Sequence, residues 1–178
     1  MAKRQGAPAR ESNAPGFPLT ESLGNQIRVT SRLFDRAIAN RLKAFGIPYG
    51  TWGFLRHLWQ KDGQTQLELA SAQELSAPTA VAAIDTMEKL ELIRRERSVK
   101  DRRNVHVHLT KKGKALEPQL LPIAINVNDL SIANIRPHEL EQFTVVLKKM
   151  QESLRTDDAR FVLDSKRKKL RMKLRTIE

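Results

Sequence analysis

One predicted hairpin constrains the fold more than any other feature, because the other apolar residues of the chain recur at helical spacing. Residues 104–109 read NVHVHL and alternate polar with apolar side chains, which is the period of a half-buried strand. Residues 93–98 predict a second strand, and the five residues between the two carry three cations and one acid. We therefore expect two short antiparallel strands joined by a charged tip.

Helical patterns precede this hairpin. The segments GIP at 46–48 and KDG at 61–63 interrupt the apolar periodicity with residues typical of turns. Ser76 is placed to cap a helix whose first turn holds Pro78, where a missing N–H costs nothing. Helices are therefore predicted over residues 20–45, 51–60, 67–75 and 76 to about 91.

Helical patterns also follow the hairpin, and Thr110 is expected to start the first of them. Two heptad-like seams come next, of the kind that packs helix on helix. Pro118 and Pro122 interrupt the first seam, so we expect a kink or a delayed helix start there, and Pro137 is expected at a helix start. The seams comprise Leu116, Leu120, Ile123, Val127 and Leu130, and then Leu140, Phe143, Leu147, Met150 and Leu154.

This order of elements predicts a mainly α fold with a small β wing (α+β), namely a winged helix-turn-helix. In such a fold the second helix of the pair fits the major groove of DNA, and a basic hairpin reaches the neighbouring minor groove. Cations at the hairpin tip would face phosphates, and Asp101 would hold one arginine by a charge-assisted bond.

The overall charge favours a polyanionic partner. The 178 residues suit one compact subunit and carry a formal net charge of +12. Nucleic acid is the first candidate and an anionic membrane surface the second, but no apolar run approaches the ~18 residues of a membrane span. The N-terminal residues lack the apolar middle of a secretory signal, so we expect a cytoplasmic protein that does not act at a membrane.

Enzymatic chemistry is not expected. There is no cysteine, which removes disulfides and thiolate zinc sites. No paired carboxylates stand beside a histidine, and no glycine-rich loop is present to hold a phosphate. His106 and His108 share a face of the predicted strand, but we favour a solvent- or phosphate-facing pair over a metal site because further ligands are missing nearby. No metal or cofactor is therefore predicted.

The stretch from Gln64 to Gly113 resembles the MarR family of bacterial transcription regulators. That family has an Asp-x-Arg motif in its wing, followed at fixed spacing by an alternating strand and Leu-Thr-x-x-Gly. The corresponding residues here are Asp101 and Arg103, then Val105, Val107, Leu109, Thr110 and Gly113; Leu69-Ala70, Ser76, Pro78-Thr79, Asp85, Glu88-Lys89-Leu90 and Leu92-Ile93 also fit the family pattern.

The resemblance implies a homodimer in which helices from both chain ends interlock and each subunit binds one half of a near-palindromic operator in double-stranded DNA. It also implies repression that a small molecule relieves. The expected organisation is a disordered basic arm at 1–18, one subunit at 19–154 and a basic tail at 155–178. Within the subunit, dimerisation helices at 20–45 and 114–154 flank a winged helix-turn-helix at 50–113. The tail is interpreted as disordered by default, with an extension of the last helix as the alternative.

Three positions depart from the family pattern. Glu74 stands where helix-turn-helix units often have Gly, and Gln73 replaces a usual apolar residue. Ala82 stands where the family often has Arg, so the recognition helix must read DNA with small groups, with a larger share of readout by the wing and by DNA shape. The predicted DNA contacts are Ser76, Ala77, Pro78, Thr79, Ala82, Thr86, Lys89, Arg95, Arg97, Lys100, Asp101, Arg102 and Arg103.

A ligand site is a further hypothesis. The family binds aromatic acids or related anions between its dimerisation helices and its winged lobe. Candidate residues here are Trp52, His57 and Trp59, with Arg28 and Arg32 as anion partners, although both tryptophans also suit a hydrophobic core. The segment GIPYGTWGFLRHLWQKDG resembles members tied to aromatic catabolism, which suggests an aromatic acid or aromatic acyl-CoA as effector. The competing interpretation is a ligand-blind or architectural DNA-binding protein of the same fold.

Overall fold

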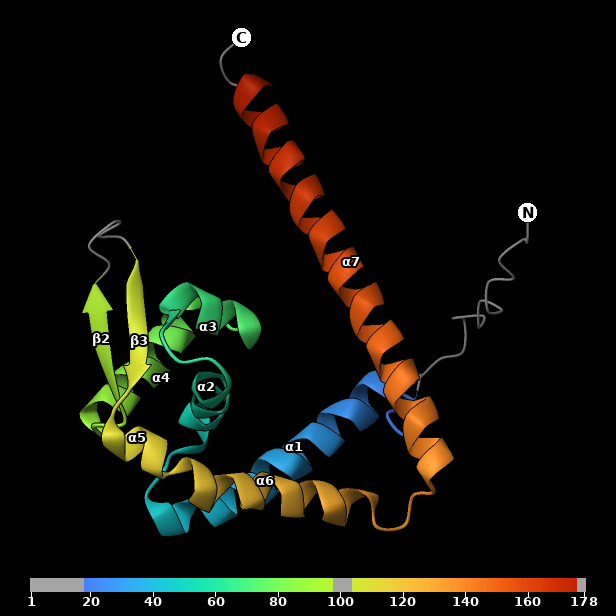
Figure 1. Ribbon diagram of the computed structural model, residues 1–178. Helices are drawn as coiled ribbons and strands as arrows, with labels where there is room; N and C mark the ends of the chain where they lie inside the picture. The colour runs from blue at the N-terminus through green and yellow to red at the C-terminus, as the bar shows by residue number, and fades with distance from the viewer. Residues whose placement is uncertain (1–17, 98–103, 176–178) are drawn as a thin grey trace. The chain divides into compact units, whose positions relative to one another are not determined.

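The computed structural model describes residues 18–97 and 104–175, with side chains through Ser165. The chain divides into a first unit of residues 1–128 and a second of residues 129–178, which are described separately. Figure 1 shows the elements. In chain order they are α1 (Leu23–Leu42), a 3-10 turn η1 (Lys43–Phe45), α2 (Tyr49–Gln60), β1 (Gln64–Thr65), α3 (Gln66–Ala72), α4 (Ala77–Lys89), β2 (Ile93–Arg97), β3 (Val105–Leu109), α5 (Lys111–Ala115), α6 (Glu117–Ile132) and α7 (Pro137–Arg175).

The predicted α+β fold with a small β wing is confirmed. The described strands form one antiparallel sheet in the order β1-β3-β2, and β2 pairs with β3 from Ile93 opposite Leu109 to Arg97 opposite Val105. β1 was not predicted, because a strand of two residues is too short to show a period. It matters for the site, because it holds the start of α3 against β3.

Side-chain caps determine where several helices begin. Thr65 and Glu68 form a reciprocal capping box at the start of α3, with Glu68 N–H donating to the Thr65 hydroxyl and Thr65 N–H donating to the Glu68 carboxylate. Ser76 caps α4 and Thr110 caps α5 in the same way, by accepting from the backbone N–H three residues later. The predicted starts at Ser76 and Thr110 are therefore confirmed.

Helix boundaries differ from the prediction at three places. α2 begins two residues early, at Tyr49, whose hydroxyl donates to Asp35 of α1 (2.5 Å); burial and this carboxylate raise the pKa of Tyr49. α3 ends at Ala72 rather than Leu75, because Glu74 adopts a left-handed backbone (φ 53°). α6 begins directly after Leu116, so Pro118 lies in its first turn and Pro122 inside the helix.

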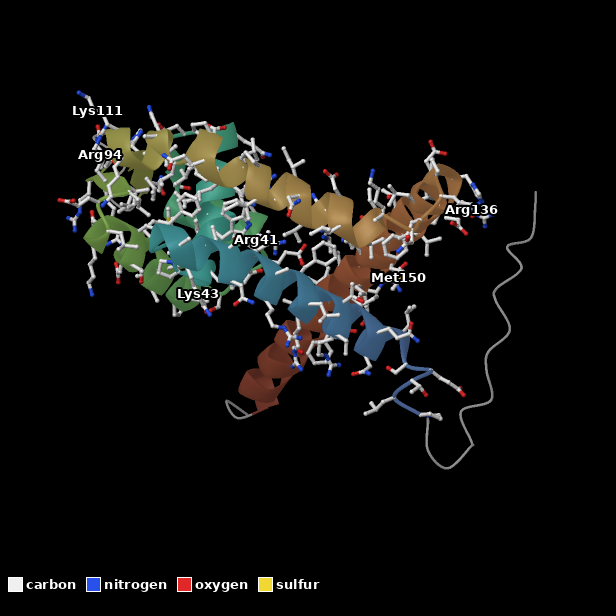
Figure 2. All side chains as sticks on the ribbon, turned by 90° about the horizontal axis from the view of Figure 1, so that it is seen from below. Arg41, Lys43, Arg94, Lys111, Arg136 and Met150 are labelled. Atoms are coloured by element: carbon white, nitrogen blue, oxygen red, sulfur yellow. The ribbon has the colours of Figure 1, made fainter. Side chains whose placement is uncertain are left out.

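The core of the first unit draws on α1 to α4, α6 and the β2–β3 hairpin. Leu42, Phe54, Leu55, Leu58, Leu69, Ile84, Met87, Leu92, Val107 and Leu120 are all fully buried or nearly so. α1 and α6 lie side by side, and the Arg41 guanidinium donates to the Asn126 side chain (3.2 Å) and to the Ala37 carbonyl (3.0 Å) (Figure 2). Burying each large apolar side chain contributes about 1.5–3 kcal/mol, so this cluster is the main source of stability.

A close approach at Gly113 joins the sheet to α5. A Cβ on Gly113 would lie 2.1 Å from the Leu92 carbonyl oxygen, so no larger residue fits there without a backbone shift. The same Leu92 carbonyl accepts from Thr110 N–H (3.0 Å), and the Gly113 carbonyl accepts from the Trp59 indole (3.0 Å). The Thr and Gly of the Leu-Thr-x-x-Gly motif therefore hold α2, the α4–β2 turn and β3 together.

Asp62 fixes the turn between α2 and β1. Its carboxylate accepts from Gly63 N–H (2.9 Å) and Leu109 N–H (2.8 Å) and lies 3.3 Å from the Lys114 ammonium. Burial would raise the pKa of Asp62, but the bonds from Leu109, Lys114 and Gly63 outweigh it and leave the pKa below its usual value. Stability from this group is therefore present above the pKa of an unfolded aspartate and is lost as pH falls through the folded value.

The second unit contains the end of α6 and α7. Pro137 is the first residue of α7, as predicted, and Glu139 receives the Arg136 N–H (2.9 Å) and the Arg136 guanidinium (2.6 Å). Phe143 and Leu154 of the predicted seam are exposed, by 58% and 67%. Helix continues through Arg175, so the tail is an extension of the last helix as far as that residue and not the disordered segment expected by default.

Two other predicted features lie outside the described residues. They are residues 1–17 of the basic arm and the hairpin tip at 98–103. Within the described part of the chain, no helix is long and apolar enough to cross a membrane.

The left-handed backbone of Glu74 and Glu91 generates a stability prediction. Both are non-glycine residues at φ 53° and 58°, a conformation that costs an L-residue about 1–2 kcal/mol. Because glycine adopts it freely but loses more entropy on folding, Glu91→Gly should raise the free energy of unfolding by about 0.5–1 kcal/mol, measured by urea denaturation. Ala82→Gly, in the middle of α4, is the matched control and should lower it by about 1 kcal/mol. A loss of stability in Glu91→Gly would contradict this explanation.

Candidate nucleic-acid interface

α4 has one buried and one exposed face. Ala80, Ile84 and Met87 point into the core, each at most 1% exposed. The opposite face is exposed and carries small side chains over its first two turns, with Glu88 and Lys89 exposed at its end. A partner can therefore approach the helix backbone closely along the first two turns. Several predicted contacts lie exposed at the N-terminal cap and in the first turns of α4, namely Ser76, Ala77, Pro78, Thr79 and Ala82. Lys89 is exposed at the C-terminal end of the helix.

The hydroxyl groups of α4 are partly occupied within the protein. Ser76 Oγ and Thr79 Oγ1 share a hydrogen bond (2.7 Å), and Thr86 Oγ1 donates to the Ala82 carbonyl (2.9 Å). Thr86 is also half-buried. Each hydroxyl oxygen retains acceptor capacity, and one hydroxyl of the Ser76–Thr79 pair keeps its proton, so α4 can still receive a bond from a base amino group and donate one.

Arg95 is bound by α4 rather than directed outward. Its guanidinium contacts the Asp85 carboxylate and lies 3.3 Å from Glu88, and its side chain is 25% exposed. In the structure its charge is balanced by these two acids and it holds β2 against α4, while its predicted contact with DNA stays a prediction. The other arginine assigned to DNA from this strand, Arg97, lies exposed at its end.

The tip residues Lys100, Asp101, Arg102 and Arg103 lie outside the described residues. Their predicted contacts with phosphates therefore remain predictions. The same holds for the predicted ion pair of Asp101.

The two histidines of β3 lie beside each other over the turn before β1. Their ring centroids are 6.4 Å apart, and His106 Nδ1 is 2.9 Å from the Gly63 carbonyl. His108 Nε2 lies 3.8 Å from the Glu96 carboxylate. Both are half-buried rather than solvent-facing, and the residues with described placement contain no group of three His, Cys, Asp or Glu close enough to hold a metal.

The residues proposed for ligand binding separate into two sets. Trp52 is 8% exposed and packs edge-to-face on Trp59 at 5.8 Å, with the Arg56 guanidinium 5.7 Å from the Trp52 ring. These contacts support the alternative that the tryptophans are core residues. His57 is half-buried on the same helix, whereas Arg28 and Arg32 are exposed on α1.

A hollow of about 520 Å³ lies between the first turns of α2 and the side of α4 that carries Thr79, Ala82, Ala83 and Thr86. Gln73, whose replacement of an apolar residue was noted in the sequence, lines it and packs on Gly53: a Cβ there would lie 1.9 Å from Gln73 Oε1. Gln73 Nε2 is buried without a hydrogen-bond partner in the structure. Sequence reasoning missed this contact, for which the only signal is a glycine inside a helix.

The pairing of Arg95 predicts how its loss affects DNA binding. Because its guanidinium is already neutralised, Arg95→Gln should change the slope of log K against log salt far less than the ~0.9 expected for one lost phosphate contact. It should also destabilise the protein by about 1 kcal/mol, because two acids lose their partner.

Arg97→Gln is the matched control, from the exposed end of the same strand. It should reduce the slope by ~0.9 and leave stability within about 0.5 kcal/mol. Equal slope changes in the two variants, measured by fluorescence anisotropy over a salt series, would show that Arg95 leaves its acids to bind a phosphate.

Comparisons with known proteins agree with this geometry. Residues 49–105 match the MarR family model. A MarR transcriptional regulator from Methanosarcina mazei Go1 is 29% identical, with a TM-score of 0.69 over 74% of this chain and 94% of its own. The S. aureus MepR–DNA complex is 25% identical, with a TM-score of 0.70 over 74% and 98% of the two chains.

A third structure shares the fold at lower identity. It is a MarR family transcriptional regulator from Listeria monocytogenes in complex with 26mer DNA, 24% identical, with a TM-score of 0.72 over 76% of this chain and 91% of its own. Residues 49–105 are therefore similar to the MarR family, and the chain shares the winged-helix fold of that family's transcriptional regulators.

Proposed function

We propose that this protein is a sequence-specific DNA-binding regulator of transcription that acts as a homodimer on a near-palindromic operator. The observation that carries the proposal is α4, whose inner face is anchored in the core and whose exposed face presents small side chains over its first two turns. Such a helix can enter the major groove closely. A net charge of +12 supports a phosphate-rich partner.

Solved relatives support the same conclusion. The S. aureus and Listeria proteins that share this fold are described in complex with DNA. Within this chain, the neutralised Arg95 leaves Lys89, Arg97 and the tip residues as the cations available to phosphates.

The proposed homodimer rests on unpartnered apolar side chains. Leu23 and Leu33 of α1 are more than half exposed, as are Phe143 and Leu154 of α7. Leaving so many large apolar groups in water is unfavourable, and a second copy of the chain would cover them.

The proposed mode of action is repression that a small ligand relieves, with an aromatic acid or aromatic acyl-CoA as the effector. Because Trp52 lies in the core and the half-buried Trp59 packs against it, the exposed Arg28 and Arg32 are the better-supported part of this hypothesis, as partners for a carboxylate or phosphate. The rival function is a ligand-blind or architectural DNA-binding protein, which the alanine-rich first half of α4 favours.

Selection of binding sites from random duplexes separates the two functions. A regulator should enrich an inverted repeat and bind it ~10³-fold or more tightly than bulk DNA at the same salt concentration. An architectural protein would enrich no motif. A wild-type protein that is monomeric, or that binds no duplex at modest ionic strength, would contradict both.

The effector hypothesis has its own test. Trp52 and Trp59 are the two tryptophans of the chain, so an effector that shifts α2 should change tryptophan emission while it releases the selected operator. Aromatic acids and their CoA thioesters should produce both effects, and an Arg28→Ala, Arg32→Ala double variant should require at least ~10-fold more ligand, the equivalent of 1.4 kcal/mol. Unchanged emission and undiminished DNA binding would exclude these ligands.

A further inference from the structure

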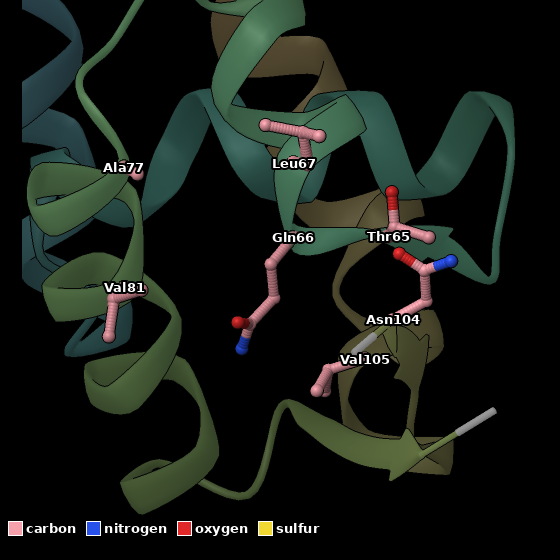
Figure 3. Close-up of a pocket in the computed structure, with 7 residues that line it drawn as sticks. All are labelled: Thr65, Gln66, Leu67, Ala77, Val81, Asn104 and Val105. Atoms are coloured by element: carbon pink, nitrogen blue, oxygen red, sulfur yellow. The ribbon is translucent and has the colours of Figure 1, made fainter. Parts of the chain in front are cut away.

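A groove of about 180 Å³ opens between α4, the first turn of α3 and the start of β3 (Figure 3). Ala77 and Val81 form its wall on α4, and Val105 forms the wall on β3. Ala77 and Val81 are exposed, and Asn104, at the mouth of the groove, is the first described residue after the wing tip. The groove therefore faces the space between the recognition helix and the wing.

Gln66 is the long polar side chain of this groove. Its carboxamide extends from the start of α3 into the space between Val81 and Val105 (Figure 3). Its neighbour Thr65 is held by the capping box, since the Thr65 hydroxyl donates to Glu68 (2.8 Å) and accepts from the Glu68 N–H (3.1 Å). The Gln66 side chain has no such bond to any residue that the structure describes. Its amide donor and its carbonyl acceptor are both available.

The composition of the groove matches the major-groove edge of one base pair. A carboxamide pairs with adenine by two bonds, accepting from the N6 amino group and donating to N7. Guanine presents two acceptors at the same edge, so it can receive only one of these bonds. Aliphatic side chains such as Ala77 and Val81 suit the thymine 5-methyl group of the same pair.

We propose that this groove selects an A·T pair in each half-site, with Gln66 binding the adenine and Ala77 and Val81 contacting the thymine methyl. The inference rests on the proposed function and adds the residue that reads a base. It resolves the difficulty raised by Ala82: the long side chain that α4 lacks is supplied by the preceding helix. Gln66 is not in the recognition helix, which is why sequence reasoning overlooked it.

The test uses the operator selected for the wild-type full-length protein. Each A·T pair is replaced in both half-sites by G·C, by an A·U pair without the thymine methyl, or by a 7-deazaadenine·T pair without N7. Dissociation constants are measured by fluorescence anisotropy at one salt concentration. The wild type should lose about 5- to 100-fold per half-site for G·C at one position, and a smaller factor at the same position for each of the two analogues.

Two variants assign the preference to Gln66. Gln66→Leu removes both hydrogen-bonding groups, and Gln66→Glu keeps the shape but loses the donor to N7. Both should retain the fold by circular dichroism, bind the 7-deazaadenine operator at least as tightly as the parent operator, and keep the uracil effect. On the G·C operator Gln66→Leu should lose only the factor due to the thymine methyl, whereas Gln66→Glu should still discriminate against guanine, whose two acceptors face its carboxylate. Gln60→Leu, at an exposed glutamine at the end of α2, is the matched control and should behave as the wild type.

Three results would overturn the inference. If Gln66→Leu keeps the full preference for A·T, another residue reads that pair. If it weakens binding to every sequence by the same factor, Gln66 binds the phosphate backbone instead. If neither the wild type nor Gln66→Leu prefers any sequence, the proposed function fails and this inference fails with it. If the wild type selects a motif but Gln66→Leu binds every operator as the wild type does, only this inference fails.

Discussion

The contact between Gly113 and the Leu92 carbonyl is the constraint on which the winged lobe depends. The hydrogen of glycine lets α5 approach the α4–β2 turn so closely that a methyl group would lie 2.1 Å from the carbonyl oxygen. Thr110, directly after β3, binds the same turn. Its N–H donates to the Leu92 carbonyl and its hydroxyl donates to the Glu91 carbonyl (2.7 Å). Because α4 ends and β2 begins at this point, the joint sets the angle between recognition helix and wing. The Thr and Gly of the Leu-Thr-x-x-Gly motif are therefore required for packing within the protein.

Several polar side chains of the candidate interface are already bound to other groups within the protein. Serine and threonine hydroxyls of α4 bond to one another or to their own helix, and Arg95 is held by two acids. A partner that approaches α4 would therefore contact mainly a narrow face of small side chains. In the proposed function, Gln66 of the neighbouring helix adds a donor for a base to the one hydroxyl proton that the Ser76–Thr79 pair keeps.

Sequence reasoning succeeded where a local rule determines the structure. The start of α4 follows from Ser76 and Pro78, and the start of α5 from Thr110, because capping involves residues only three apart. It failed where the determinant is distant or too short to repeat. β1 exists because Gln64 and Thr65 pair with β3 about forty residues later, and two residues show no period. The partners of Arg95 were equally hidden, because they depend on the direction in which the chain leaves α4 at Glu91, a residue with no sequence signal for its positive φ. Residues 1–17 and 98–103 lie outside what the structure describes, so the arm and the wing tip stay predictions.

The pairing of Arg95 also bears on how α4 meets a nucleic acid. Asp85 and Glu88 are nearly half exposed, at 46% and 43% of their side chains. Two bare carboxylates on a recognition helix would repel the phosphates that flank the groove it enters, and this repulsion grows as the interface loses water. Arg95 between them halves this negative charge, which would reduce the repulsion if α4 enters a groove as proposed. In the proposed function, exposed cations at the edge of the lobe would then attract any duplex, and the fit of the small-residue face of α4 would determine which sequence is bound tightly.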